Sequence, residues 1–283
     1  MLPYIGGKSK ISKHLIIPVI PNDISTYVEP FSGQFWTFFM MDLTMYPNLS
    51  NVVYNDVNDL NTNLYRCLKY PDKLLQECKK IPVQQKGDMV TPPQCREFFN
   101  RAQSILYSPE RKPIDTMNFK MAAMHALILA SVYSGANPQK SKYIDLKGKY
   151  HSKFTSFMNK LSNTKWTQKL KKINFVENQD FQKCIEKWDS PTTYFYLDPP
   201  YYIVGEGNYY SNHDFTSNDH ERLRDSLQKI QGKFGLSYYP FDQLKDWYPL
   251  DSYSWHEKSF FKAAMASKGK KQVPSVELLI TNY

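Results

Sequence analysis

The sequence lacks any apolar run of the roughly 18 residues that a membrane-spanning helix needs. Its longest apolar stretch, residues 122–132, is interrupted by His125 and is typical of a buried helix. The first residues do not show the basic-then-apolar pattern of a secretory signal peptide. These absences predict a cytoplasmic protein that does not act in a membrane.

Cysteine is scarce, and the spacing of the cysteines argues against a disulfide framework and against a zinc site. The four cysteines, Cys67, Cys78, Cys95 and Cys184, are far apart and form no C-x-x-C pair. This spacing predicts reduced thiols in place of a disulfide framework or a zinc site. The six histidines show no ligand spacing either, so the sequence predicts no metal.

A nucleoside-triphosphate loop is also missing, although Gly6-Gly7-Lys8-Ser9 resembles the end of one. Leu2 stands where that loop needs its first glycine, and no predicted strand precedes it. Two glycines before a lysine and an expected helix make a suitable site for a carboxylate at a helix N-terminus. The alternative is an ordinary N-terminal turn.

The positive charge is concentrated in one segment. The chain has 283 residues and a net charge of +9, and residues 136–172 contain ten lysines and one acid. Aromatic residues are interleaved with these lysines, a pattern typical of surfaces that neutralise phosphates and stack on bases. The alternative is a solvated lysine face. The candidate nucleic-acid-binding residues are Lys140, Lys142, Tyr143, Lys147, Lys149, Tyr150 and Lys153.

The pattern of apolar residues predicts an α/β fold with an insert. Strands are expected at 26–30, 51–55, 174–177, 193–197, 234–238 and 276–281, and helices at 59–80, 94–106, 119–133 and after Thr216-x-x-Asp219. A helical, basic middle separates the two α/β parts. We therefore expect a catalytic domain formed by residues 1–60 and 173–283, interrupted by an inserted domain at residues 61–172.

The most specific motif is Asp198-Pro199-Pro200-Tyr201, which directly follows a predicted strand. An adenine amino group is a poor nucleophile because its lone pair is delocalised into the ring. A carboxylate from Asp198 and the carbonyl of Pro199, each accepting one N–H, would free that lone pair. Paired prolines hold the chain extended and remove competing donors, and Tyr201 offers a flat face for a base pulled from its stack. The alternative is a strand that ends in a Pro-Pro turn.

Acidic residues also end two earlier predicted strands. Glu29 is followed by Pro30 and a turn that contains Gly33, and Asp56 ends the next strand. Doubly wound folds present a cofactor at such a turn and hold its ribose hydroxyls with an acid at the end of the next strand. Each acid alone is weak evidence, but their order and spacing together predict a cofactor site.

In this order the motifs resemble those of the Dam-type (D12-class) family of DNA adenine-N6 methyltransferases. The similar segments are residues 2–8, 26–33, 54–58, 178–181, 198–201, 233–237 and 275–283, and more loosely residues 134–150. The resemblance implies a Rossmann-like S-adenosylmethionine-dependent sheet with an inserted, mainly helical DNA-recognition domain, acting on double-stranded DNA. It implies cofactor contacts from Tyr4, Gly7, Lys8, Glu29, Phe31, Gly33, Asp56, Asp180 and Phe181. Asp180 would bond the adenine of the cofactor and Phe181 would stack on it.

The sequence departs from the family after Gly33. Members usually continue with a second glycine and small residues, whereas this chain has Gln34, Phe35 and Trp36. Loss of that glycine restricts how closely the backbone approaches a cofactor, so a non-catalytic DNA-binding relative is one alternative. An RNA adenine-N6 methyltransferase is a second, and a cytosine-N4 enzyme is a third. Lysine replaces most of the arginine of the family's recognition hairpin, so the target sequence does not carry over.

Overall fold

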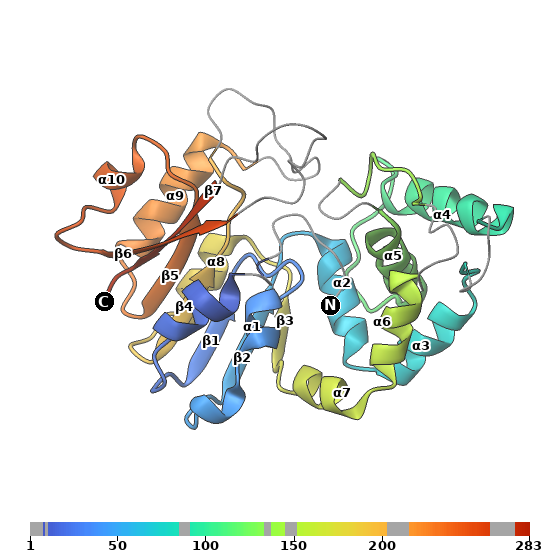
Figure 1. Ribbon diagram of the computed structural model, residues 1–283, viewed down its shortest axis with the longest axis horizontal. Helices are drawn as coiled ribbons and strands as arrows, with labels where there is room; N and C mark the ends of the chain where they lie inside the picture. The colour runs from blue at the N-terminus through green and yellow to red at the C-terminus, as the bar shows by residue number, and fades with distance from the viewer. Residues whose placement is uncertain are drawn as a thin grey trace. The chain divides into compact units, whose positions relative to one another are not determined.

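The computed structural model describes residues 8, 11–84, 91–132, 137–144, 152–202, 215–260 and 275–283. Contacts between these residues divide the chain into two compact units (Figure 1). Of the described residues, those within 8–57 and 177–283 form the sheet unit, and those within 58–176 form the helical unit. The chain therefore leaves the sheet unit once and returns to it.

The sheet has seven strands in the order β3-β2-β1-β4-β5-β7-β6. Strand β1 is parallel to β2 and β4, and β4 is parallel to β5, whereas β7 is antiparallel to β5 and β6. This mixed α/β architecture is compatible with a methyltransferase fold. The strands are β1 Thr26–Glu29, β2 Asn51–Asn55, β3 Phe175–Glu177, β4 Thr193–Leu197, β5 Lys233–Tyr238, β6 Ser254–Phe260 and β7 Ser275–Thr281.

The strand order reverses between β1 and β4. In open parallel sheets, ligands bind outside the carboxyl ends of the strands at such a switch point. Glu29 ends β1 and Asp198 directly follows β4, so both lie at this edge. Because β7 runs antiparallel to β5, its amino end, which contains Glu277, lies at the same edge.

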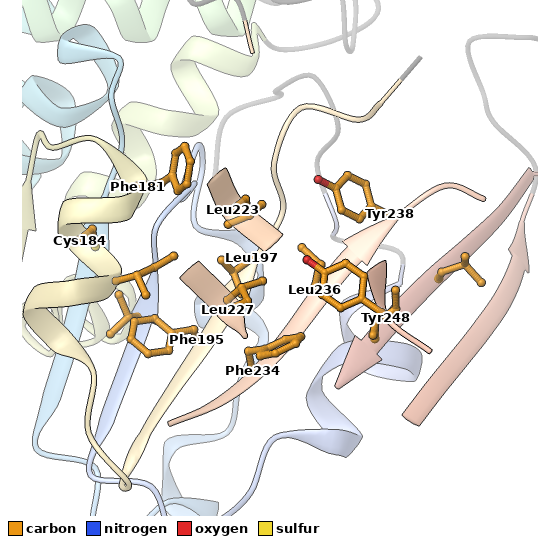
Figure 2. Close-up of a cluster of buried hydrophobic side chains, with 14 of the residues drawn as sticks. Phe181, Cys184, Phe195, Leu197, Leu223, Leu227, Phe234, Leu236, Tyr238 and Tyr248 are labelled. Atoms are coloured by element: carbon orange, nitrogen blue, oxygen red, sulfur yellow. The ribbon is translucent and has the colours of Figure 1, made fainter. Parts of the chain in front are cut away.

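The two faces of the sheet differ in chemistry because side chains alternate along each strand. One face is aliphatic and aromatic, and it packs against helices α8 (Phe181–Trp188) and α9 (Ser217–Leu227). Figure 2 shows Phe181, Leu223 and Leu227 beside Phe195, Leu197, Phe234 and Leu236. On the other face Tyr27 packs against Tyr194 and against Phe35 and Phe38.

Short helices complete the sheet unit. They are η1 Ser12–Ile16, η2 Ile17–Val19, α1 Trp36–Met40, η3 Leu43–Met45 and α10 Leu244–Trp247. The predicted start of α9 is confirmed, because the Thr216 side chain accepts the N–H of Asp219 and the Asp219 carboxylate accepts the N–H of Thr216. This reciprocal capping satisfies two backbone donors that a helix leaves unpaired.

The helical unit is built around one apolar helix. Its helices are α2 Asp59–Leu68, α3 Pro71–Lys79, α4 Pro93–Leu106, α5 Phe119–Ser131, α6 Lys153–Leu161 and α7 Thr164–Lys171. Residues Ala122–Ser131 of α5 are all buried, as the apolar run predicted. The single helix expected at 59–80 is wrong: it ends before Tyr70, and α3 restarts at Pro71, whose ring cannot continue a helix.

Among the described residues, none of the helices combines the length and the apolar composition that crossing a bilayer requires.

Candidate active site

The turn after β1 is held by the end of β2. Ser32 donates its backbone N–H to the carbonyl of Asn55 (2.9 Å), and the Ser32 hydroxyl accepts the backbone N–H of Asn55 (3.0 Å). The Asn55 side-chain amide donates to the carbonyls of Pro30 (2.9 Å) and Gln179 (3.1 Å), and its oxygen accepts the N–H of Gln179. Asn55 therefore joins three strand ends, a role that the sequence pattern did not reveal.

Gly33 and Asp56 meet at this turn. The backbone N–H of Gly33 donates to Oδ2 of Asp56 at 3.0 Å, and the Tyr54 hydroxyl donates to the Gly33 carbonyl at 2.9 Å. Gly33 has a φ of 49°, a left-handed conformation that glycine adopts without steric cost. Gly33 and Asp56, both predicted to contact the cofactor, thus lie in direct contact.

Phe35, one of the three residues that follow Gly33, has a backbone conformation that glycine adopts more readily. Its φ is 54° and its ψ is 36°, and it is the one non-glycine residue with positive φ among those the structure describes. Its ring is buried and packs on Phe38 (centroids 4.8 Å) and Tyr54 (5.3 Å). The turn therefore contains a second left-handed residue after Gly33 without a second glycine, at a backbone cost of about 1–2 kcal/mol.

This combination predicts opposite effects of glycine at two neighbouring phenylalanines. Phe35→Gly and Phe35→Ala both lose buried packing, but the glycine variant is expected to be the more stable by about 1 kcal/mol, because alanine keeps the left-handed strain. Phe38 lies inside α1 and is equally buried. There the glycine variant is expected to be the less stable by about 1 kcal/mol. Urea denaturation of the four variants checks this, and the same order at both sites would contradict it.

Glu29 lies beneath the turn. Its Oε1 accepts the Tyr27 hydroxyl at 2.6 Å and the backbone N–H of Phe38 at 3.2 Å, and the residue is 3% exposed. Burial raises the pKa of Glu29 well above its usual range. The described contacts of Glu29 thus join β1 to α1, and its contact with a cofactor stays a prediction.

An aromatic cluster lies beside the turn. Phe31 stacks on Phe181 with centroids 5.3 Å apart, and Phe215 lies 5.6 Å from both rings. The guanidinium of Arg222, on α9, lies 4.9 Å from the Phe181 centroid and pairs with Asp180 at 2.8 Å. Asp180 also caps α8 by accepting the N–H of Gln182. The pair assigned to the cofactor adenine therefore shares a partner, Arg222, that the sequence did not indicate.

Asp198 belongs to a buried ionic cluster. Lys8 Nζ lies 2.9 Å from Asp198 Oδ1 and 3.0 Å from Glu277 Oε1, and it donates to the Tyr201 hydroxyl, which in turn donates to Glu277. The side chains of Lys8, Asp198 and Glu277 are 7%, 21% and 1% exposed. We call these four residues the acid–lysine cluster. It contains two carboxylates and one ammonium.

The cluster changes the acidity of its members. Burial raises the pKa of Asp198 to about 6, because its effect exceeds the lowering by Lys8; Glu277 adds a smaller increase. Burial alone would lower the pKa of Lys8, but Asp198 and Glu277 outweigh it and raise that pKa above its usual value. The ammonium of Lys8 therefore stays charged at neutral pH. Asp198 is mostly ionised at neutral pH and becomes protonated as the pH falls below about 6.

The structure brings together several of the predicted site residues. Lys8, Asp198 and Tyr201 lie in the acid–lysine cluster, and Pro199 beside them is buried. Tyr201 packs edge-on against Tyr239, with centroids 4.3 Å apart, so its role as a stacking surface stays a prediction. Tyr4 and Gly7 lie outside the described residues. Glu277 was missed, although a single acid in the run Val276-Glu277-Leu278-Leu279-Ile280 is a signal for a functional carboxylate.

The basic segment has two kinds of residue. Lys140, Lys142 and Lys153 are exposed, whereas Tyr143 packs edge-on against Phe99 with centroids 5.5 Å apart. Phe154 and Phe157, two of the aromatic residues interleaved with the lysines, are buried on α6, so for these two the expected stacking on bases is wrong: they lie at helical spacing on the core face. Lys147, Lys149 and Tyr150 lie outside the described residues, as does the hairpin expected there.

Comparison with known proteins identifies the family of the chain. No curated protein sequence matches the chain. A family model described as D12 class N6 adenine-specific DNA methyltransferase matches residues 4–263, which include the turn after β1, Asp56, Asp180 and the Asp198–Tyr201 motif. Since this match covers most of the 283 residues, the chain belongs to the D12 class N6 adenine-specific DNA methyltransferase family.

Proposed function

We propose that the protein transfers the methyl group of S-adenosylmethionine to N6 of an adenine that has been flipped out of double-stranded DNA. The observation that carries this proposal is the position of Asp198. It directly follows β4 at the switch point of the sheet, in a buried cluster with Lys8, Tyr201 and Glu277. Membership of the family supplies the reaction, and this edge of the sheet offers the chemistry that the reaction needs.

The residues at this edge fit the proposed cofactor. The turn at Gly33 has the left-handed backbone of a cofactor turn, and Asp56 beside it would hold the ribose hydroxyls. Phe31 and Phe181 would offer an aromatic surface to its adenine, and the acid–lysine cluster, which has an excess of one negative charge, would favour its cationic sulfonium. When bound, S-adenosylmethionine supplies a methyl group on a cationic sulfur. Because the guanidinium of Arg222 lies over the ring of Phe181, it would have to move aside, or stay on one part of the ring, for an adenine to stack there.

The protein's part in the reaction is to orient the target amino group. Asp198 and the Pro199 carbonyl each accept one of its N–H bonds, which favours a pyramidal nitrogen and directs its lone pair at the methyl carbon. Displacement at a methyl group needs alignment more than acid–base catalysis. Groups that hold the reactants in position lower the activation barrier, because the translational and rotational entropy is already lost on binding. Tyr201 offers a face to the everted base, which must leave the stack to reach this edge.

The carboxylate form of Asp198 is required for this role, because the protonated acid offers a donor where an acceptor is needed. The pKa of Asp198 is raised to about 6 by burial. We therefore expect kcat/KM to be at half its plateau near pH 6 and to fall about tenfold for each further pH unit of acidification. Single-turnover methylation between pH 5 and 8 measures this. A plateau that extends unchanged to pH 5 would contradict it.

The helical unit is proposed to bind the phosphates of the DNA. Replacing the exposed residues Lys140, Lys142 and Lys153 with alanine is expected to weaken DNA binding and to reduce the slope of log K against log salt by about 3, or about 0.9 per lost phosphate contact. The matched control replaces Lys13, Lys229 and Lys245, which are exposed on the sheet unit. Fluorescence anisotropy at several salt concentrations measures both slopes. An equal change in the two variants would show only a general charge effect.

The proposed function is tested by incubating the protein with methyl-labelled S-adenosylmethionine and duplex DNA of mixed sequence, beside RNA of matched sequence. Label that appears in DNA as N6-methyladenine supports the proposal. Label in RNA alone would move the substrate to RNA. No transfer, with DNA bound and no cofactor binding by calorimetry, would identify a non-catalytic relative whose altered turn at Phe35 has abolished the cofactor site.

A further inference from the structure

Glu277 lies where it can control the groups around Asp198. It is almost completely buried on β7, and its Oε1 receives both the ammonium of Lys8 (3.0 Å) and the hydroxyl of Tyr201. Carboxylates are rarely buried to this degree unless they are paired and hydrogen-bonded. Glu277 comes from the last strand of the chain, about 80 residues after the Asp198 motif, and its position at this edge follows from the antiparallel pairing of β7 with β5.

The ammonium of Lys8 has three donors, and the described contacts account for all of them. They go to Asp198 Oδ1, to Glu277 Oε1 and to the Tyr201 hydroxyl. Nζ also lies 4.5 Å from the centroid of the Tyr201 ring, within the range of a cation–π contact. The position of Lys8 is thus set by three partners at once, and Glu277 supports two members of that set.

We propose that Glu277 is a positioning residue for methyl transfer, which holds Lys8 and Tyr201 so that Asp198 can receive the target amino group. This inference rests on the proposed function. Without Glu277, Asp198 would be the one remaining carboxylate partner of Lys8 in the cluster, and a tighter Lys8–Asp198 pair would compete with the amino group for the carboxylate. The Tyr201 hydroxyl would at the same time lose its acceptor.

Glu277 also sets the charge of the cluster. With it, two carboxylates face one ammonium, so the cluster retains an excess negative charge beside the proposed sulfonium. Without it, Lys8 neutralises Asp198 and that excess is lost. The titratable groups that influence Asp198 or its partners at this edge are Lys8 before η1, Glu29 in β1, Tyr196 in β4, Tyr201 after β4, Tyr239 after β5 and Glu277 in β7.

The first test is the Glu277→Gln variant, with Glu257→Gln as its matched control. Glu257 is an exposed residue of the neighbouring strand β6, so its substitution makes the same chemical change outside the cluster. Glu277→Gln is expected to lower kcat by roughly 100-fold, the scale of a misplaced catalytic group, with KM for DNA and cofactor within about twofold, and to move the acid limb to lower pH. The control is expected to match the wild type. Unchanged kcat and acid limb in Glu277→Gln would overturn the inference.

A double-mutant cycle tests whether Glu277 acts through Lys8. In a Lys8→Met background, Glu277→Gln is expected to cause a much smaller loss of kcat than in the wild type, because the part of its effect that passes through Lys8 is already lost. A full additional loss would show that Glu277 acts independently and would overturn the inference. Glu277→Asp covers the case in which the glutamine variant does not fold: it keeps the charge and shortens the reach, so kcat is expected to fall while the acid limb stays in place. An unchanged kcat, or an acid limb that moves to lower pH than in the wild type, would contradict this.

A titration without substrate separates this inference from the proposed function. Carboxyl-carbon NMR of the cofactor-free protein is expected to show that Asp198 titrates at lower pH in Glu277→Gln than in Glu257→Gln, because a neighbouring negative charge has been removed. The measurement does not depend on methylation. If the wild type transfers no methyl group but the titration moves, the proposed function fails and the coupling stands. If methylation occurs and the titration does not move, the coupling fails.

Discussion

Replacing Asp198 with alanine is expected to lower the rate of methyl transfer by about 10³-fold, the scale on which removal of a preorganised electrostatic group acts. The variant loses one of the two acceptors proposed to orient the amino group, and the Pro199 carbonyl alone cannot hold both N–H bonds. DNA affinity is expected to change by less than twofold, since Asp198 belongs to the sheet unit and the basic segment proposed to bind phosphates belongs to the helical unit. Single-turnover methylation and DNA binding measure the two effects.

The fold of this variant is expected to survive. The pKa of Asp198 is raised in the folded protein, so the ionised side chain opposes folding; that cost grows as pH rises from about 4 to about 6 and then stays constant. Removing the carboxylate relieves this cost while Lys8 keeps Glu277 as a partner. The unfolding midpoint is therefore expected to move by no more than about 4 °C, the effect of about 1 kcal/mol in a protein of this size.

Asp189→Ala is the matched control for that variant. The Asp189 carboxylate accepts the backbone N–H groups of Gln231 and Gly232, at the opposite end of β4 from Asp198. Its loss is expected to lower stability by about 1–3 kcal/mol because these donors lose their partner, with the rate per folded molecule unchanged. Equal losses of rate in the two variants would show that Asp198 acts on the fold and has no part in the chemistry.

Replacing Lys8 with methionine is expected to cost about 3–5 kcal/mol of stability at pH 8, because Asp198 and Glu277 would then be buried without their shared cation. The sign with pH follows from the pKa of Asp198, which Lys8 now lowers and which would rise further in the variant. The deficit is therefore expected to shrink at pH 5, where Asp198 is protonated. Urea denaturation at both pH values measures it.

The exposed Lys13 on η1 gives the control for this substitution. Lys13→Met is expected to change stability by less than about 0.5 kcal/mol at either pH, as surface substitutions usually do. A Lys8→Met deficit that is equal at pH 5 and pH 8 would mean that the two carboxylates do not interact through Lys8, and the acid–lysine cluster would lose its explanation.

The sequence by itself determined the family and much of the sheet. Strands β1, β2 and β4 were predicted within a residue or two, because buried parallel strands appear as short apolar runs and their ends carry Glu29, Asp56 and Asp198. The capping box of α9 and the burial of α5 were also predicted, since both depend on local pattern. The mostly parallel α/β sheet follows from these local features.

Tertiary structure decided what depends on contacts between distant segments. Strand β6 was missed because Ser254–Phe260 has no clear alternation, and its pairing with β7 defines it. The left-handed backbone of Phe35 could not be predicted, because phenylalanine rarely adopts this conformation. The packing of its ring on Phe38 and Tyr54 compensates for the backbone strain. Glu277 joined Lys8 and Asp198 only through the antiparallel pairing of β7, a choice of direction that no local sequence pattern encodes.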